Sequence, residues 1–317
     1  MEKLRSTIKK FIKNVLLLVP YLNTKIKNYD FLVQVVENCG CFQPGHFYSP
    51  IPNLSEIESE AKAIFAEKDL EEINLNTEKQ IRLLEKIKIF YSEYPYRDNN
   101  YDNQRYRYKK SGAFYRFSDS VFLFGMIRNF RPKSIIEVGS GHSSAIMLDT
   151  DELFFDSNIQ FTFIEPNPDN RLMNVLREYD KSRCKIIKNK VQSVELDLFQ
   201  QLGENDILFI DSTHVSKVGS DVNHLIFEVL PTLKSGVLIH FHDIFYPFEL
   251  PQKWILKAKF FWNENYLLHA FLMNNEKYEI VAFNSYLQKI KTDWFKQEMP
   301  ECLVGMEETG SIWLQKK

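Results

Sequence analysis

Short apolar runs between residues 134 and 241 constrain the fold most strongly, because segments with helical patterning separate them. Strands that are apolar on both faces and alternate with helices are typical of a parallel sheet covered on both sides. The runs are Ser134–Val138, Phe161–Ile164, Lys185–Ile187, Ile207–Ile210 and Val237–Phe241, and the helix-like segments are Ser143–Leu148, Asn170–Glu178 and Asp221–Leu233. Two further strands are expected at Tyr278–Phe283 and Ser311–Leu314. The sequence therefore predicts an α/β, doubly wound, mainly parallel sheet.

The chain before the first of these strands has a different character. It is helical in pattern and rich in aromatic residues, so we expect an N-terminal extension over residues 1–130 and the sheet domain over residues 131–317. Between Tyr94 and Phe117, tyrosine and arginine alternate with few aliphatic residues. Two interpretations stay open, a loop that folds over a ligand or an aromatic loop that seals a domain edge. We predict that Tyr106–Phe117 closes over the bound ligands.

Charge and cysteine content narrow the choice of partners. A formal net charge of −2 argues against a nucleic-acid partner, which requires a clustered basic surface. Four cysteines without a disulfide framework favour a reducing, cytoplasmic location. Apolar residues from Leu4 to Leu16 repeat at helical spacing, and the apolar run Val15–Pro20 is too short to span a bilayer. We expect this N-terminal helix to pack on the protein body, with peripheral membrane contact as the alternative.

The first strand leads into a glycine turn, Glu137-Val138-Gly139-Ser140-Gly141-His142-Ser143-Ser144. Glycine lets the backbone approach a ligand closely, and the N-terminus of the following helix presents free N–H groups. Alone this signal is weak, because a tight turn without a ligand has the same pattern and Ser144 only approximates the last small residue of a dinucleotide fingerprint. The residues that the turn offers to a ligand are Glu137, Gly139, Ser140, Gly141, Ser143 and Ser144.

The second strand ends in an acid, Glu165, which strengthens the interpretation of the glycine turn. A carboxylate at this strand end is placed to accept hydrogen bonds from a ribose diol. Ligands of open α/β sheets bind outside the carboxyl ends of the strands, so the turn and the acid share one edge of the sheet. Together they favour binding of a nucleoside-containing ligand over an unoccupied turn.

Polar residues also follow the fourth and fifth strands. Asp211 and His214 come after the fourth strand, and His242 and Asp243 end the fifth. Neighbouring parallel strands end at one edge, so these carboxylates and imidazoles should converge beyond the glycine turn. Such a group can bind a divalent cation, or it can position and deprotonate a hydroxyl group.

These motifs together resemble those of class I S-adenosylmethionine-dependent methyltransferases. Glu137–Gly141 is similar to their first motif and Glu165 to their ribose-binding acid. Phe209–His214 and His240–Asp243 resemble a branch of small-molecule and sugar O-methyltransferases, some of them metal-dependent. The resemblance runs from about residue 105 to the C-terminus. It implies a terminal antiparallel hairpin, S-adenosyl-L-methionine as cofactor, and a small-molecule or glycan hydroxyl as acceptor.

The resemblance also implies roles for single residues. In that branch the positions matching Asp211 and Asp243 hold magnesium, and the position matching His214 is the general base. His214, Asp211 and Asp243 are therefore the expected catalytic group. The residue before the last aspartate is a carboxylate in those enzymes, whereas here it is His242. Because magnesium prefers oxygen ligands, a site of Asp211, His242 and Asp243 either lacks the metal or favours a softer one.

Two other functions share parts of this pattern. A nicotinamide-dependent oxidoreductase would use the same glycine turn and acid, but the imperfect third small residue and the implied terminal hairpin argue against it. A non-catalytic, methyltransferase-like binding module has no need of Asp211, His214 and Asp243 at one edge. We therefore predict an active methyltransferase. The sequence carries no signal for an oligomeric state.

Overall fold

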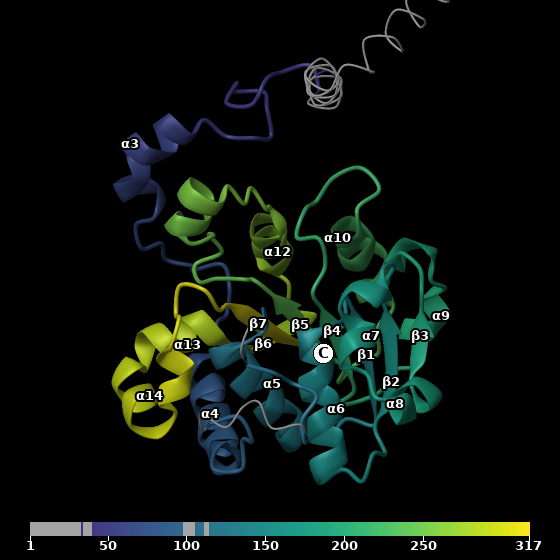
Figure 1. The fold of residues 1–317 in the computed structure, drawn as a ribbon. Helices are drawn as coiled ribbons and strands as arrows, with labels where there is room; N and C mark the ends of the chain where they lie inside the picture. Colours follow the sequence, from purple (N-terminus) through teal and green to yellow (C-terminus); the bar gives the residue numbers. More distant parts are fainter. Residues whose placement is uncertain (1–32, 34–39, 98–104, 111–113) are drawn as a thin grey trace, which may run out of the picture. The chain divides into compact units, whose positions relative to one another are not determined.

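A seven-stranded sheet organises residues 65–317 of the computed structural model (Figure 1). The strand order is β3-β2-β1-β4-β5-β7-β6. Strands β1 to β5 are parallel, and β7 lies antiparallel between β5 and β6. The bounds are β1 Ser134–Val138, β2 Gln160–Ile164, β3 Lys185–Ile187, β4 Ile207–Ile210, β5 Leu238–His242, β6 Tyr278–Phe283 and β7 Ser311–Lys316. The predicted doubly wound, mainly parallel sheet with its antiparallel hairpin is confirmed.

The structure describes residues 33, 40–97, 105–110 and 114–317. The chain forms two compact units, residues 1–64 and residues 65–317. The first unit contains α3 (Leu54–Ile64), preceded by turns in which the ring of Phe42 stacks on that of His46. The predicted N-terminal helix and its alternative membrane contact fall in residues 1–20, outside the described part. Within the described ranges, no helix combines the length and the apolar character needed to cross a bilayer.

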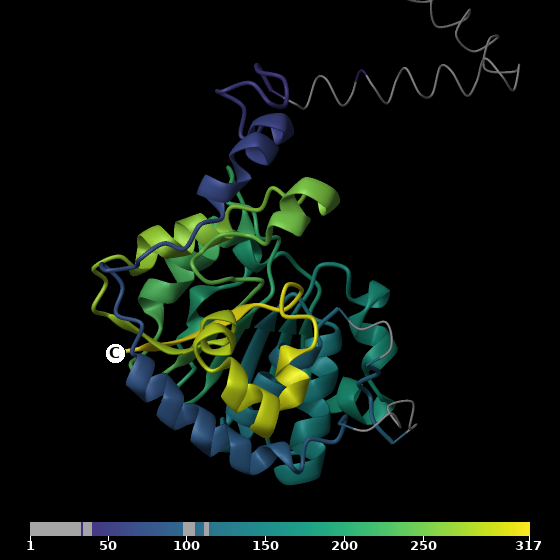
Figure 2. The same cartoon turned by 90° about the vertical axis from the view of Figure 1, so that its left-hand side faces the viewer.

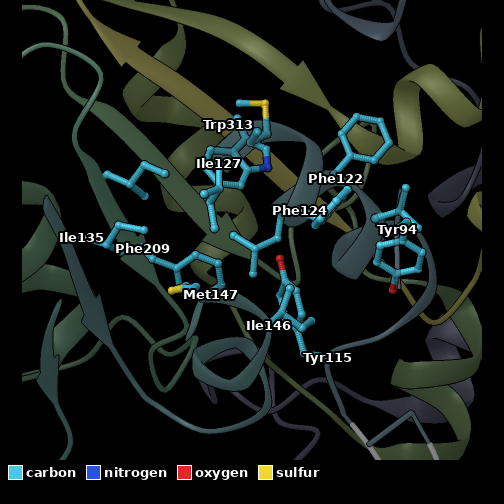
Figure 3. Close-up of a cluster of buried hydrophobic side chains, with 14 of the residues drawn as sticks. Tyr94, Tyr115, Phe122, Phe124, Ile127, Ile135, Ile146, Met147, Phe209 and Trp313 are labelled. Carbon is cyan, nitrogen blue, oxygen red and sulfur yellow. The ribbon is translucent and has the colours of Figure 1, made fainter. Parts of the chain in front are cut away.

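Each face of the sheet carries its own hydrophobic core, because neighbouring residues of a strand point to opposite faces. In β1, Ile135 belongs to one core and Ile136 to the other. Figure 3 shows part of the first core, where Ile135, Phe209 and Trp313 from the sheet lie near Ile127 of a covering helix. Burial on both faces explains why the strands are continuous apolar runs in the sequence.

Helices cover both faces. Those that contribute to the first core are α4 (Thr77–Tyr91), α5 (Phe117–Phe130), α6 (His142–Phe154), α7 (Leu172–Val175), α13 (Asn284–Ile290) and α14 (Thr292–Glu298). Those on the other face are α9 (Leu196–Phe199), α10 (Asp221–His224), η3 (Leu225–Val229), α11 (Leu230–Thr232) and α12 (Glu264–Leu272). Short connecting turns are η1 (Pro168–Asn170), α8 (Glu178–Arg183), η2 (Val191–Ser193), η4 (Trp254–Ala258) and η5 (Pro300–Leu303). Figure 2 shows α4, in blue, beside the yellow α14, and Trp294 donates a hydrogen bond to Glu85 between them.

Helix α5 lies inside the sheet unit. Every residue from Ser118 to Ile127 is buried, because α5 packs against both α4 and α6. A helix that is buried all round belongs inside a domain. The compact units accordingly divide after Ile64, whereas the sequence predicted a boundary at residue 130. Residues 65–130 are therefore part of the sheet unit.

The segment rich in tyrosine and arginine is shared between the core and the ligand edge. Arg107 donates to both carboxylate oxygens of Asp180, at 2.7 and 2.8 Å, and to Asp149 at 3.0 Å. The Arg107 side chain is only 2% exposed, and Tyr108 is fully buried. The predicted closure over ligands is therefore wrong for Tyr106–Tyr108, because buried ion pairs fix this part to α6 and α8. Among the residues of this segment that the structure describes, Phe114–Arg116 line the cavity described below.

Candidate active site

A cavity of about 1270 Å³ opens at the carboxyl ends of the parallel strands. The strand order reverses between β1 and β4, which is where ligands of open α/β sheets bind. Residues at the ends of β1, β2, β4 and β5 line the cavity, among them Gly139, Glu165, Asp211, His242 and Asp243. The sheet therefore brings together strand-end residues that the sequence predicted to meet.

Gly139 allows β1 and β4 to end side by side. Its φ of +79° lies in the left-handed region, and a Cβ atom there would sit 1.8 Å from the carbonyl oxygen of Asp211. No other residue type fits without moving the end of β4. At Gly141 a Cβ atom would lie 3.3 Å from the side chain of Arg171, so that position is less restricted. The turn therefore depends most on Gly139, whereas both glycines leave backbone open to the cavity.

Glu137 supports the turn from behind. It is fully buried and accepts hydrogen bonds from the hydroxyl of Ser143, at 2.5 Å, and from that of Ser144. Burial raises the pKa of Glu137 to about 8. Neither Glu137 nor Ser144 lines the cavity, although the sequence predicted that both contact the cofactor. Their oxygens are directed at one another, so they fix the start of α6, while Gly139, Ser140, Gly141 and Ser143 do line the cavity.

Glu165 lies beside the glycine turn at the end of β2. One carboxylate oxygen accepts the N–H of Asn167 at 2.8 Å, and the other faces the N–H of Ser140 at 3.4 Å. Each carboxylate oxygen has two lone pairs, so both can accept a further hydrogen bond. The side chain is partly exposed and lines the cavity. Its position next to the turn is the one predicted for a ribose-binding acid.

His214 lies at the floor of the cavity, held between carboxylates. Its Nδ1 is 2.8 Å from Glu264 Oε2, and its Nε2 is 3.3 Å from Asp211 Oδ1 and 3.5 Å from Asp243 Oδ2. Burial alone would lower the pKa of His214, but the bonds to Asp211 and Glu264 and the charge of Asp243 raise it well above the usual value. The surrounding carboxylates therefore favour the protonated form of the imidazole.

The backbone at this floor is unusual. His214 and Asp243 have φ values of +59° and +55°, in the left-handed region that non-glycine residues rarely adopt. Such conformations persist only where the surroundings hold them, and they cluster at functional sites. The backbone C=O of His214 accepts the N–H groups of Asn263 and Glu264, at 3.1 and 3.2 Å, which fixes this loop to the start of α12.

Glu264 is the functional residue that the sequence did not reveal. It is 1% exposed, and its other oxygen accepts the hydroxyl of Ser212 at 3.2 Å. A carboxylate on Nδ1 fixes which way an imidazole faces and leaves Nε2 directed at the cavity. Glu264 begins a helix fifty residues after His214, in a region without a recognisable motif, so only the fold brings the pair together.

His242 is a second buried imidazole, and it lies between Asp243 and Asp119. Its Nε2 is 3.4 Å from Asp243 Oδ1 and its Nδ1 is 4.0 Å from Asp119 Oδ2. Burial raises the pKa of Asp119 to about 6, although the positive charge of His242 opposes this. The ring of Tyr115 lies 4.8 Å from that of His242 and closes this side. His242 is as buried as His214 and also lines the cavity, with its ring nitrogens near the carboxylates of Asp243 and Asp119.

The arrangement does not fit the metal site suggested by the sequence. A divalent ion shared by Asp211 and Asp243 needs the space between their oxygens, and Nε2 of His214 lies within 3.5 Å of both. The imidazole itself occupies the space between the two carboxylates. In the part of the chain that the structure describes, no group of three or more His, Cys, Asp and Glu side chains has metal-site geometry. We therefore assign no metal to Asp211, His242 and Asp243.

Beyond His214 the cavity has an aromatic wall, formed by Trp254, Phe260 and Trp262. Phe260 and Trp262 stack with ring centroids 4.5 Å apart and planes 5° from parallel. Trp254 meets them edge-on, at 5.6 and 5.7 Å. The ring of Trp262 is 4.6 Å from that of His214. This wall was not predicted, because its residues lie in the long connection between β5 and α12.

Comparison with known proteins agrees with this geometry. A family model described as a methyltransferase domain matches residues 136–244. An uncharacterized protein of Archaeoglobus fulgidus is 34% identical over 169 residues, which cover 52% of this chain and 76% of that protein. The chain belongs to this methyltransferase family. The resemblance seen in the motifs is thereby confirmed.

Solved structures of methyltransferases align with this methyltransferase at low sequence identity. PaMTH1 of Podospora anserina, determined with SAH bound, aligns with a TM-score of 0.41 at 14% identity, over 88% of this chain and 99% of that one. An O-methyltransferase of Bacillus cereus in complex with SAH aligns with a TM-score of 0.39 at 14% identity, over 83% and 97%.

Proposed function

We propose that this methyltransferase transfers a methyl group from S-adenosyl-L-methionine to a hydroxyl group of a small molecule or glycan. The observation that carries the proposal is the position of His214. Its imidazole, held by Glu264, faces the same cavity as the glycine turn and Glu165. The proposed base and the proposed binding site for the nucleoside of the cofactor therefore line the same cavity.

The cofactor side of the cavity lies at the ends of β1 and β2. The backbone from Gly139 to Gly141 can approach a ligand closely, and α6 begins directly after it with free N–H groups. Glu165 can accept hydrogen bonds from the two ribose hydroxyls. Arg171 is exposed beside Gly141 and offers a cation to the carboxylate of the cofactor. When bound, the cofactor supplies an activated methyl group on a positively charged sulfur.

The acceptor side contains the proton-transfer group. We assign the proton of the acceptor hydroxyl to Nε2 of His214, because Glu264 occupies Nδ1 at 2.8 Å. A positioned base of this kind contributes about a hundredfold to ten-thousandfold in rate. Alignment of the hydroxyl with the methyl group can supply about 7–11 kcal/mol of the barrier. The chain's own work is therefore mainly to orient the acceptor and to accept one proton.

The resting charge of His214 sets a condition on this step. An imidazole that is already protonated cannot accept the hydroxyl proton, and the raised pKa of His214 favours the protonated form. A nearby positive charge lowers the pKa of a cationic group. The sulfonium charge of a bound methyl donor has this effect, so donor binding favours release of the proton from His214. The neutral form of His214, which can act as the base, is therefore more favoured in the donor complex than in the free enzyme.

Two finer points complete the proposal. Phe114–Arg116 covers the ligands, because these described residues of the tyrosine- and arginine-rich segment line the cavity, and Phe114 is 75% exposed there.

The protein works in the cytoplasm, where thiols stay reduced. In support, the cysteines Cys41, Cys184 and Cys302, which lie in the described ranges, are free thiols.

The test is transfer of an isotope-labelled methyl group from the donor to a panel of monosaccharides, sugar phosphates and phenols. We expect His214→Asn to lower kcat by about a hundredfold or more while the affinity for S-adenosylhomocysteine changes little. His46→Asn, in the other compact unit, serves as the control. Full activity of His214→Asn at neutral pH would refute the base. Binding of nicotinamide dinucleotide instead would indicate an oxidoreductase, and donor binding without transfer to any acceptor would indicate a binding module.

A further inference from the structure

The aromatic wall presents exposed ring surface to the cavity. Phe260 is 37% exposed and Trp254 and Trp262 are half-buried, although all three line the cavity. Exposed aromatic faces that border a cavity are typical of ligand sites, because burying them against a ring gains apolar contact. Trp262 also touches the ring of His214, so a ring on this wall lies next to the proposed base.

Lysines line the same cavity as this wall. Lys217, Lys253 and Lys257 are exposed and line the cavity. Lys257 lies in η4 and Lys253 directly precedes it. The same element contributes Trp254. Lys253 is 3.4 Å from Glu308. Across the described residues, no carboxylate oxygen lies within 4.0 Å of the ammonium groups of Lys217 and Lys257.

The acids at this mouth are already engaged. Asp221 accepts the N–H and the hydroxyl of Thr213, at 2.9 and 2.6 Å. Glu308 is shared between Arg116, at 2.8 Å, and Lys253. Asp211 and Asp243 lie against the cationic imidazole of His214. Hydrogen bonds to Thr213 leave the negative charge of Asp221 in place, but the four cations Arg116, Lys217, Lys253 and Lys257 outnumber the two acids Asp221 and Glu308 among these lining residues. This part of the mouth is therefore net positive, although the whole chain has a net charge of −2.

We propose that the acceptor is an anionic ring alcohol, a sugar-like ring that carries a phosphate or carboxylate group. The ring lies on Phe260 and Trp262, the anion meets Lys217 and Lys257, and the reacting hydroxyl faces Nε2 of His214. This inference rests on the proposed methyl transfer and names its substrate class. Ring stacking and a charge-assisted contact select different parts of one molecule, so the two features together define a narrower class than either alone.

Methyl transfer to the acceptor forms one bond, breaks another and moves one proton. The new bond joins the acceptor oxygen to the methyl carbon, while the bond from that carbon to the donor sulfur breaks. The sulfur keeps the electron pair and becomes neutral, and the hydroxyl proton goes to Nε2 of His214. The anion of the acceptor takes no part in bond making; it holds the ring in place.

The experiment compares three groups of acceptors, namely hexose phosphates, hexuronates and neutral hexoses, with the wild type, Lys257→Glu and Lys259→Glu. Lys259 follows the same turn but does not line the cavity, so it is the matched control for the charge change. Labelled methyl transfer gives kcat/KM for each acceptor. Calorimetry gives the affinity for S-adenosylhomocysteine, and for each sugar with that product already bound.

We expect at least one anionic group to exceed the neutral hexoses by about tenfold or more in kcat/KM, the size of one charge-assisted hydrogen bond. Lys257→Glu should reduce that preference by about tenfold, and added salt should weaken it, whereas Lys259→Glu should leave it unchanged. The favoured group, phosphate or carboxylate, identifies the anion.

The inference is wrong if neutral hexoses are preferred, or if Lys257→Glu behaves like Lys259→Glu, while S-adenosylhomocysteine still binds and methyl transfer proceeds. In that case the proposed function stands. If the product does not bind and no acceptor is methylated, the proposed function itself fails, and the inference fails with it.

Discussion

Replacing Glu264 by Gln should move the pH dependence of methyl transfer to lower pH. The Glu264 carboxylate lies 2.8 Å from Nδ1 of His214 in a site where Glu264 is 1% exposed. Glutamine keeps the shape and can still accept the hydroxyl of Ser212, but it removes the negative charge. His214 must be neutral to accept a proton, and its raised pKa moves this to higher pH than for an ordinary imidazole.

The size of the shift follows from the strength of the bond. A hydrogen bond to a charged partner contributes about 1.5–3 kcal/mol, and one pKa unit corresponds to about 1.4 kcal/mol. The pKa of His214 should therefore fall in Glu264→Gln, and the rising limb of the pH profile should move to lower pH by about one to two units. The same bond stabilises the fold below the unfolded pKa of about 6.5 and is lost as pH rises through the folded pKa. The loss of stability in the variant should accordingly be greatest at acid pH.

The assay is kcat/KM for methyl transfer between about pH 5 and 10, with Glu276→Gln, an exposed acid near the end of α12, as the control. We expect the rising limb of the variant to lie at lower pH than that of the wild type and the control. A limb that stays in place or moves to higher pH would refute the account of His214. A uniform fall at every pH would show that Glu264 has only a structural role.

Other parts of the structure give further predictions. Gly139→Ala should lower the free energy of unfolding by about 1–3 kcal/mol in denaturant, whereas Gly219→Ala, at a similar φ but with open space, should cost less; equal losses would contradict the close contact with β4. Arg107→Ala should cost about 3–5 kcal/mol in the same measurement, because it leaves Asp149 and Asp180 buried without their cation, and a loss below 1 kcal/mol would contradict that role. S-adenosylmethionine, but not its uncharged product, should release a proton on binding, seen as a dependence of the binding heat on the buffer. Equal proton release by both ligands would contradict the coupling to His214.

The sheet and its ligand edge could be predicted because their signals are local. A strand such as Ile207–Ile210, buried on both faces, must be apolar throughout, and a residue such as Asp211 that follows it must emerge at the carboxyl end. The positions of Glu165, His214 and Asp243 follow from that rule. The predicted order of helices and strands needed no long-range information.

The parts that the sequence did not predict depend on contacts between distant segments. Glu264 reaches His214 only because α12 packs beside the loop after β4, and the aromatic wall comes from a connection without periodicity. Glu137 has the position of a ligand contact in the sequence, yet strand direction turns it toward the serines of α6. Arg107 has the composition of an anion site, but its partners are the protein's own buried acids.

Calorimetry with S-adenosylhomocysteine tests the central claim most directly. The account predicts binding to the wild type, and a loss of about 1–3 kcal/mol in Glu165→Ala, because two hydroxyls of the ribose lose their acceptor. Glu178→Ala, an exposed acid outside the cavity, should bind like the wild type. Binding that is unaffected by Glu165→Ala, or absent from the wild type while a nicotinamide dinucleotide binds, would contradict the assignment of this cavity.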